Sequence, residues 1–201
     1  MNVALIDYGA GNVTSVARAL RHLGATIACT NRPEDIAAAR CLILPGVGHC
    51  GALISSLEAH GIREPLLEAI SRGTPFLGIC LGLQALYQSS DEAPSLTGLG
   101  LLEGRVEHLP QSVKLPHMGW NQLHVLRPSR LLDGISLAAY FYFAHSYAAP
   151  AGGAETVAIC EHGREFTAVL ENESAFGVQF HPEKSGAPGA KLLENFLRLA
   201  A

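Results

Sequence analysis

The sequence of 201 residues has little charge and no region in which basic residues concentrate. Only 16% of the residues are charged, and the formal net charge is -4. Because Lys and Arg are scattered, neither a groove that follows a phosphate backbone nor an anionic membrane surface is predicted. We therefore expect no nucleic-acid partner, no membrane partner and a small molecule as the substrate.

The cysteines are few, and their spacing is irregular. There are five of them, an odd number, and no two form a Cys-x-x-Cys pair, which argues against a disulfide framework or a structural zinc site. The histidines also lack metal-ligand spacing such as His-x-x-x-His. We expect a reducing compartment, no metal and no other cofactor.

Long apolar runs are missing as well. The uncharged stretch at residues 73–90 contains Gly, Pro, Gln and Ser, which is typical of a buried strand followed by a helix rather than a membrane span. Met1 and Asn2 lead directly into an apolar run that Asp7 interrupts, without the basic start of a secretory signal. The expected location is the cytoplasm.

Short apolar runs alternate with helical patterns through the first half of the chain. The runs 3–6, 41–44 and 76–79 are continuous, as in parallel strands that helices cover on both faces. From about residue 100 to 178 short strands dominate, which predicts mixed pairing at one edge. The sequence thus predicts an open, mostly parallel α/β sheet with helices on both faces. In the absence of a linker or repeat, we expect a single domain over residues 1–201.

Residues 78–82 read Gly-Ile-Cys-Leu-Gly and lie between a predicted strand (75–79) and a helical pattern (83–87). A strand, tight turn and helix of this kind builds the nucleophile elbow of Gly-x-Ser-x-Gly hydrolases, here with Cys80 in place of serine. Taken alone, the motif fits a buried apolar cysteine equally well. Other cysteines in apolar runs lack the turn and are predicted to be structural: Cys29, Cys41 and Cys160.

A candidate base follows the apolar run 175–180. Pro182 favours an extended backbone at His181, and residues i and i+2 of an extended chain point to one side, so His181 and Glu183 should face the site together. The histidine can carry the thiol proton while the carboxylate orients the imidazole. By itself a solvated strand end explains His-Pro-Glu better. Combined with the elbow, it predicts a Cys-His-Glu triad.

Residues 45–48, Pro-Gly-Val-Gly, follow another predicted strand, and their glycines allow a backbone amide to point outwards. Attack on a carboxamide places negative charge on its oxygen, which such amides stabilise. We predict an oxyanion hole formed by Leu81 and by Gly48 or Val47. A phosphate cradle is the weaker interpretation, because no Walker A lysine follows.

These motifs resemble the class I glutamine amidotransferases, and the resemblance covers the whole chain. Within that family the chain is most similar to the glutaminase subunits of imidazole glycerol phosphate synthases. The segments that carry this resemblance are 7–12 (DYGAGN), 44–48 (LPGVG), 78–84 (GICLGLQ) and 114–121 (KLPHMGWN).

The resemblance implies a glutaminase that forms a cysteinyl thioester and passes ammonia to a separate cyclase subunit, a (β/α)8 barrel. It implies a heterodimer that acts in histidine biosynthesis. Gln84 and the backbone around Ser146 and Tyr147 would hold the amino-acid end of glutamine. The residues implied at the docking face beside the site are Asn12, Trp120 and Lys184.

His49 and Cys50 depart from the family pattern, in which a small residue and then an aromatic one follow the glycine-rich loop. We expect Cys50 to be packed. Two other interpretations stay open: a related glutaminase that feeds a different synthase, such as the one making pyridoxal phosphate, and a catalytically silent domain on the same fold. The segment 114–121 argues against the first, and the complete triad argues against the second.

Overall fold

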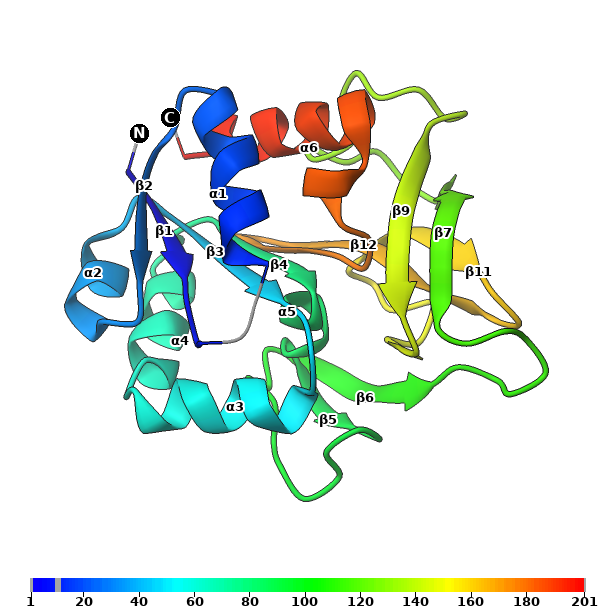
Figure 1. Ribbon diagram of the computed structural model, residues 1–201, viewed down its shortest axis with the longest axis horizontal. Coiled ribbons are helices and arrows are strands. Elements are labelled where there is room, and N and C mark those ends of the chain that lie inside the picture. Colours follow the sequence, from blue (N-terminus) through cyan, green and yellow to red (C-terminus); the bar gives the residue numbers. More distant parts are fainter. Residues whose placement is uncertain (1, 10–11, 201) are drawn as a thin grey trace.

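A mixed sheet of eight strands forms the centre of the molecule, of which the computed structural model describes residues 2–9 and 12–200 (Figure 1). The strand order is β2-β1-β3-β4-β13-β12-β11-β8. The parallel part consists of β1 (Asn2–Ile6), β2 (Thr26–Thr30), β3 (Cys41–Gly46), β4 (Phe76–Cys80) and β13 (Ala175–Val178). The antiparallel edge consists of β12 (Glu165–Asn172), β11 (Thr156–Glu161) and β8 (His124–Val125). The predicted α/β class and its mixed edge are confirmed.

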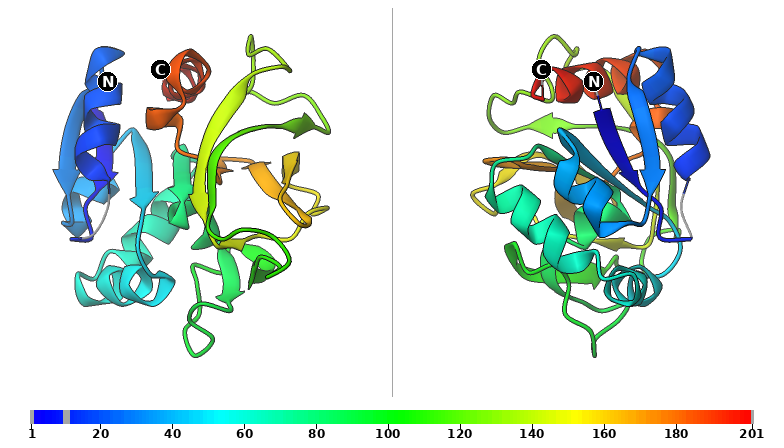
Figure 2. Two further views of the ribbon diagram at one scale, coloured as in Figure 1. Left: turned by 45° about the vertical axis from the view of Figure 1, so that its right-hand side comes forward. Right: turned by 90° about the vertical axis from the view of Figure 1, so that its left-hand side faces the viewer.

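Helices cover both faces of the sheet (Figures 1 and 2). On one face lie α1 (Val13–His22) and α6 (Gly186–Arg198), and on the other lie α2 (Pro33–Ala38), α3 (Cys50–Ala59) and α4 (Arg63–Ser71). Successive residues of β1 pack alternately into the two cores, since Val3 and Leu5 join the cluster with α1 and α6 while Ala4 and Ile6 join the other. Strand β3 is buried along its whole length, as the continuous apolar run predicts.

Two smaller sheets extend the molecule beside the main one. The first contains β10 (Tyr147–Ala148), β6 (Leu102–His108) and β5 (Tyr87–Ser90). The second is a two-stranded ribbon of β7 (His117–Gln122) and β9 (Tyr140–His145), which lie side by side in Figures 1 and 2. Phe141 and Phe143 of β9 pack into the main core, which fixes the ribbon against the sheet. Among the described residues no helix is long and apolar enough to cross a membrane.

The predicted helix at 83–87 is wrong. The helix after Cys80, α5 (Leu81–Gln84), has only four residues, and β5 begins at Tyr87. The carbonyls of Ala85 and Leu86 accept hydrogen bonds from Leu99 and Leu102. These long-range bonds hold residues 85 and 86 in the turn that leads into β5.

The cysteines outside the site divide into two groups. Cys41 and Cys160 are buried within strands, as predicted for structural residues, whereas Cys29 is exposed on β2 at the sheet edge. Cys50 begins α3 and is 4% exposed, so the expected packing is confirmed. Burial raises the pKa of the Cys50 thiol.

Candidate functional site

Cys80 lies at the sharp turn between β4 and α5. Its φ of 54° and ψ of -106° place a non-glycine residue in a conformation that L-amino acids rarely adopt. The glycines on either side are required by close packing: a Cβ atom on Gly78 would lie 2.4 Å from the carbonyl oxygen of Gly82, and one on Gly82 would lie 1.9 Å from that of Leu44. The turn therefore projects Cys80 beyond the carboxyl end of β4, as the Gly-x-Cys-x-Gly motif predicts.

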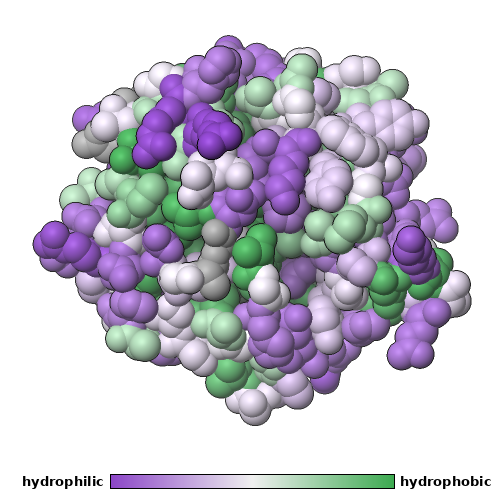
Figure 3. All heavy atoms as spheres, in the orientation of Figure 1, coloured by the Kyte–Doolittle hydropathy of each residue, from purple (hydrophilic) through white to green (hydrophobic). Residues whose placement is uncertain are grey.

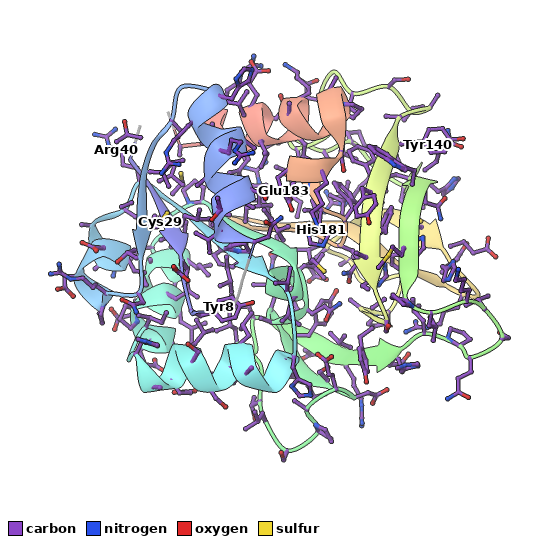
Figure 4. All side chains as sticks on the ribbon, in the orientation of Figure 1. Tyr8, Cys29, Arg40, Tyr140, His181 and Glu183 are labelled. Atoms are coloured by element: carbon purple, nitrogen blue, oxygen red, sulfur yellow. The ribbon has the colours of Figure 1, made fainter. Side chains whose placement is uncertain are left out.

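His181 and Glu183 meet in a way that the sequence pattern does not describe. Strand β13 ends at Val178, and Pro182–Lys184 form the 3-10 helix η1, so the predicted extended segment is wrong beyond His181. The tight turn nevertheless brings His181 Nδ1 within 3.0 Å of Glu183 Oε1. Both side chains are almost completely buried, near the middle of the molecule (Figure 4).

Asn12 lies behind this pair. Its Nδ2 donates a hydrogen bond of 2.8 Å to the same Oε1 atom of Glu183. The resemblance places Asn12 on the docking face, but its side chain is half-buried and contacts the carboxylate. The geometry gives it a direct influence on the orientation of Glu183.

The environment of His181 favours the protonated imidazole. Burial lowers its pKa, but hydrogen bonds to Cys80 and Glu183 and the charges of these two groups outweigh the burial and raise the pKa to about 10. The protonated form of His181 is thus favoured beside Cys80. The histidine is placed to exchange a proton with the sulfur, whose nucleophilic form is the thiolate.

The same shift makes a prediction about stability. The pKa of His181 is 6.5 in an ordinary environment and about 10 in the folded chain, so the stabilisation is full below 6.5 and is lost as the pH rises through 10. We expect the melting temperature of the wild type to lose its advantage over His181→Gln between neutral pH and about 10. Circular dichroism melts of both proteins measure this difference, and a gap that stays constant over the range contradicts the assignment.

A cleft of about 380 Å³ opens at Cys80. Most of the predicted site residues line it, namely Val47, Gly48, Cys80, Leu81, Gln84, Ser146, Tyr147, His181 and Lys184. Glu183 lies behind His181, and Trp120 lies outside the cleft on β7. Within the described part of the chain, no cluster of three or more His, Cys, Asp or Glu side chains could hold a metal ion.

The proposed oxyanion donors differ in their availability. Leu81 is the first residue of α5, so its amide has no acceptor within the helix. Gly48 has a φ of 94°, and it also lines the cleft. The peptide of Val47, in contrast, is held by Tyr8, whose hydroxyl accepts from Val47 N at 3.0 Å and donates to Val47 O at 2.9 Å. In this conformation Val47 is not a free donor, which corrects the prediction for that residue.

Gln84 lines the cleft, but its amide nitrogen is fully used inside the protein. Nε2 donates to the carbonyl of Tyr147 at 2.7 Å and to Oε1 of Gln179 at 3.0 Å. Nε2 of Gln179 in turn donates to Sγ of Cys80 at 3.5 Å. Any contact of the Gln84 side-chain amide with a ligand must therefore use its oxygen, Oε1.

Gln179 and Glu92 are functional candidates that the sequence reasoning missed. Gln179 is a polar residue in the apolar run 175–180, two positions before His181, and this interruption is a signal that could have identified it. Glu92 lies in a turn after β5 and lines the cleft, where Oε2 accepts from the amide of Cys50 at 2.7 Å. Only the tertiary fold brings Glu92 to the site.

Comparison with known proteins identifies the class. The family model described as glutamine amidotransferase class-I matches residues 4–200. The chain therefore belongs to the class I glutamine amidotransferase family, as the motifs predict.

Within that family the chain belongs to the group of imidazole glycerol phosphate synthase subunit HisH. The protein of this name from Methanothermobacter thermautotrophicus is 48% identical over 197 residues, which cover 98% of each chain. The one from Desulfitobacterium hafniense is 46% identical over 195 residues, or 96% of this chain and 92% of the relative.

Solved structures agree on the fold. A crystal structure of a glutamine amidotransferase superimposes with a TM-score of 0.78 at 21% identity and covers 98% of both chains. The PurLQS structure from Thermotoga maritima gives a TM-score of 0.76 at 21% identity, covering 98% of this chain and 97% of that one.

Proposed function

We propose that this chain is the glutaminase subunit of an imidazole glycerol phosphate synthase. It hydrolyses glutamine to glutamate and ammonia and passes the ammonia to a separate cyclase subunit, with which it forms a heterodimer in the cytoplasm for histidine biosynthesis. The observation that carries this proposal is the cleft lined by Cys80, on a strained turn, and by His181, which Glu183 orients. The near full-length similarity to HisH proteins supports the choice of synthase.

The chemistry follows from these positions. The thiolate of Cys80 attacks the side-chain carboxamide carbon of glutamine, and His181 transfers its proton to the departing nitrogen, which leaves as ammonia. The γ-glutamyl thioester remains on Cys80. His181 then removes a proton from a water molecule that attacks the thioester, releasing glutamate and restoring the imidazolium. Glu183 keeps Nδ1 of His181 engaged throughout, so Nε2 handles the proton.

The oxyanion of each tetrahedral intermediate is stabilised by backbone amides. Leu81 supplies one, because its position at the start of α5 leaves the amide free. Gly48 supplies the second once its peptide turns towards the cleft. Tyr8 bonds the carbonyl of Val47, which belongs to the same peptide as the Gly48 amide, so this bond restrains the turning of that amide.

The far wall of the cleft suits the amino-acid end of glutamine. Ser146 and Tyr147 provide backbone groups, and Gln84 presents its side-chain oxygen there. Glu92 is the carboxylate that lines the cleft, and with Oε2 held by Cys50 N it can accept the α-ammonium group.

The β7–β9 ribbon offers the surface for the cyclase subunit. Its outer side exposes Met118, Trp120 and Tyr140 by 65%, 55% and 52%. Hydrophilic and hydrophobic residues are interspersed over the side of the molecule shown in Figure 3. Trp120 packs against Tyr142 at 5.9 Å, and the Lys184 ammonium lies 5.6 Å from the centre of the Tyr142 ring. Because Lys184 also lines the cleft, this surface adjoins the site where ammonia forms.

Removal of the exposed indole should weaken the complex and leave the subunit folded. We expect Trp120→Ala to reduce affinity for the cyclase subunit about 30-fold, as for an interface hot spot of about 2 kcal/mol, with little change in melting temperature. Leu137→Ala is the matched control, because Leu137 is 75% exposed but lies outside the ribbon. Titration calorimetry measures both, and an equal loss in the two variants contradicts docking at the ribbon.

The function itself is tested by adding glutamine to the purified chain and following glutamate release, alone and with the candidate cyclase subunit. We expect slow release alone and fast release in the complex. No glutamate under either condition supports the silent domain, and activation only by a pyridoxal phosphate synthase subunit supports the other glutaminase.

A further inference from the structure

Gln179 carries a buried side-chain amide, and its hydrogen bonds must offset the free energy that burial of the amide costs. It follows β13 and is 0% exposed, between the apolar residues Val178 and Phe180. Burial of an amide without hydrogen bonds is unfavourable by several kcal/mol in apolar surroundings, roughly 1–3 in proteins. An aliphatic side chain would fill this position without that cost, so the contacts of the amide explain its presence.

The contacts of Gln179 connect the wall of the cleft formed by Ser146 and Tyr147, here called the substrate wall, to the nucleophile. The carbonyl of Tyr147 accepts from Gln84 Nε2 at 2.7 Å and from His145 Nδ1 at 2.9 Å. Gln84 then donates its other proton to Gln179 Oε1, and Gln179 Nε2 reaches Sγ of Cys80 at 3.5 Å. The chain of bonds runs without interruption from the wall to the thiol.

The network also determines the orientation of both amides. A main-chain carbonyl cannot donate, so the Gln84 group that contacts Tyr147 O must be the nitrogen. The same nitrogen contacts Gln179, which must therefore present its oxygen to Gln84 and its nitrogen to Cys80. Sγ consequently receives an N–H donor.

We propose that Gln179 is a positioning residue for Cys80. Its side-chain N–H donates to Sγ, holds the sulfur in the cleft and favours the thiolate. Its side-chain oxygen accepts from Gln84, which fixes the orientation of this donor. A donor of this kind stabilises an anionic sulfur more than a neutral thiol, because hydrogen bonds to charged groups are the stronger ones. The main-chain amide of Gln179 bonds Ala168 O at 2.9 Å, which anchors the residue to β12. The inference deepens the proposed function, since it rests on Cys80 as the nucleophile.

Alkylation of Cys80 by iodoacetamide at neutral pH tests the proposal without glutamine or the cyclase. We expect Gln179→Met, which keeps the size but removes the donor, to alkylate at Cys80 about tenfold more slowly than the wild type. Asn195→Leu is the matched control, because Asn195 is a buried amide with two hydrogen bonds, to Leu131 O and Asp133 O, in α6. It should lose stability but alkylate Cys80 at the wild-type rate, with the modified site located by peptide mass spectrometry.

Wild-type alkylation rates in Gln179→Met, or an equal slowing in Asn195→Leu, overturn the proposal. If Gln179→Met does not fold, NMR spectra of the 15N-labelled wild type test the proposal instead. The chemical shift of the Gln179 side-chain amide should change when Cys80 is alkylated, while that of Asn195 should not. An unmoved Gln179 signal also overturns it. Failure of the wild type to release glutamate with its cyclase would reject the proposed function separately, because neither measurement here depends on turnover.

Discussion

Cys80→Ala should abolish glutamine-dependent synthesis by the complex and leave synthesis from added ammonium salt intact. In the proposed mechanism the thiol forms the covalent intermediate, and removal of a nucleophile from a triad costs about 10⁴-fold or more in rate. The proposed complex leaves the synthase chemistry to the other subunit, so free ammonia should bypass the loss. Product formation with glutamine and with ammonium salt, measured on the same preparation, gives the two rates.

Cys50→Ala is the control for this experiment. Cys50 is a second thiol beside the glycine-rich loop, but it is buried at the start of α3, and burial raises its pKa. We expect the Cys50→Ala complex to keep most of its glutamine-dependent activity. A glutamine-like electrophile should likewise label Cys80 in the wild type. Labelling at Cys50, or loss of the ammonium-dependent activity in Cys80→Ala, contradicts the division of labour between the two subunits.

The sequence predicted those parts of the site whose cause is local. Gly78 and Gly82 mark the elbow because close backbone packing excludes a side chain there, and Pro182 marks the extended backbone of His181 although not the turn that follows. Continuous apolar runs identified the buried parallel strands. These features depend on a few neighbouring residues, so a single sequence reveals them.

The parts that it missed depend on contacts between distant segments. Gln84 and Gln179 are 95 positions apart, and Cys50 and Glu92 are 42 apart. No local sequence pattern indicates that the residues of these pairs are in contact. The helix predicted at 83–87 ends early for the same kind of reason, because long-range bonds from Leu99 and Leu102 hold residues 85 and 86 in the turn that leads into β5.

Tyr8 makes another contact with a distant residue, and this contact bears on how the activity of the isolated glutaminase is kept low. Its hydroxyl bonds both the N–H and the carbonyl of Val47, 39 positions away. Burial raises the pKa of Tyr8 to about 12, so the hydroxyl stays protonated at neutral pH and can donate to Val47 O. As long as both bonds hold, the peptide before Gly48 keeps one orientation. A free glutaminase would lose ammonia to water, so a resting loop of this kind suits a subunit that waits for its partner.

We expect Tyr8→Phe to raise glutamine hydrolysis by the isolated chain and to reduce the stimulation that the cyclase subunit and its nucleotide ligand cause. An oxyanion donor contributes about 10²- to 10³-fold in rate, which bounds the gain from releasing the loop. Gly48→Pro should be slow under every condition, because proline lacks the N–H and cannot adopt the φ of 94° found at Gly48. Tyr87→Phe is the control, since Tyr87 is also buried, its pKa is likewise raised to about 12 by burial, and its hydroxyl bonds Thr167 rather than Val47. Hydrolysis rates alone, with cyclase and with cyclase plus ligand decide the matter: a Tyr8→Phe chain that behaves like Tyr87→Phe excludes Tyr8 as the restraint on the loop.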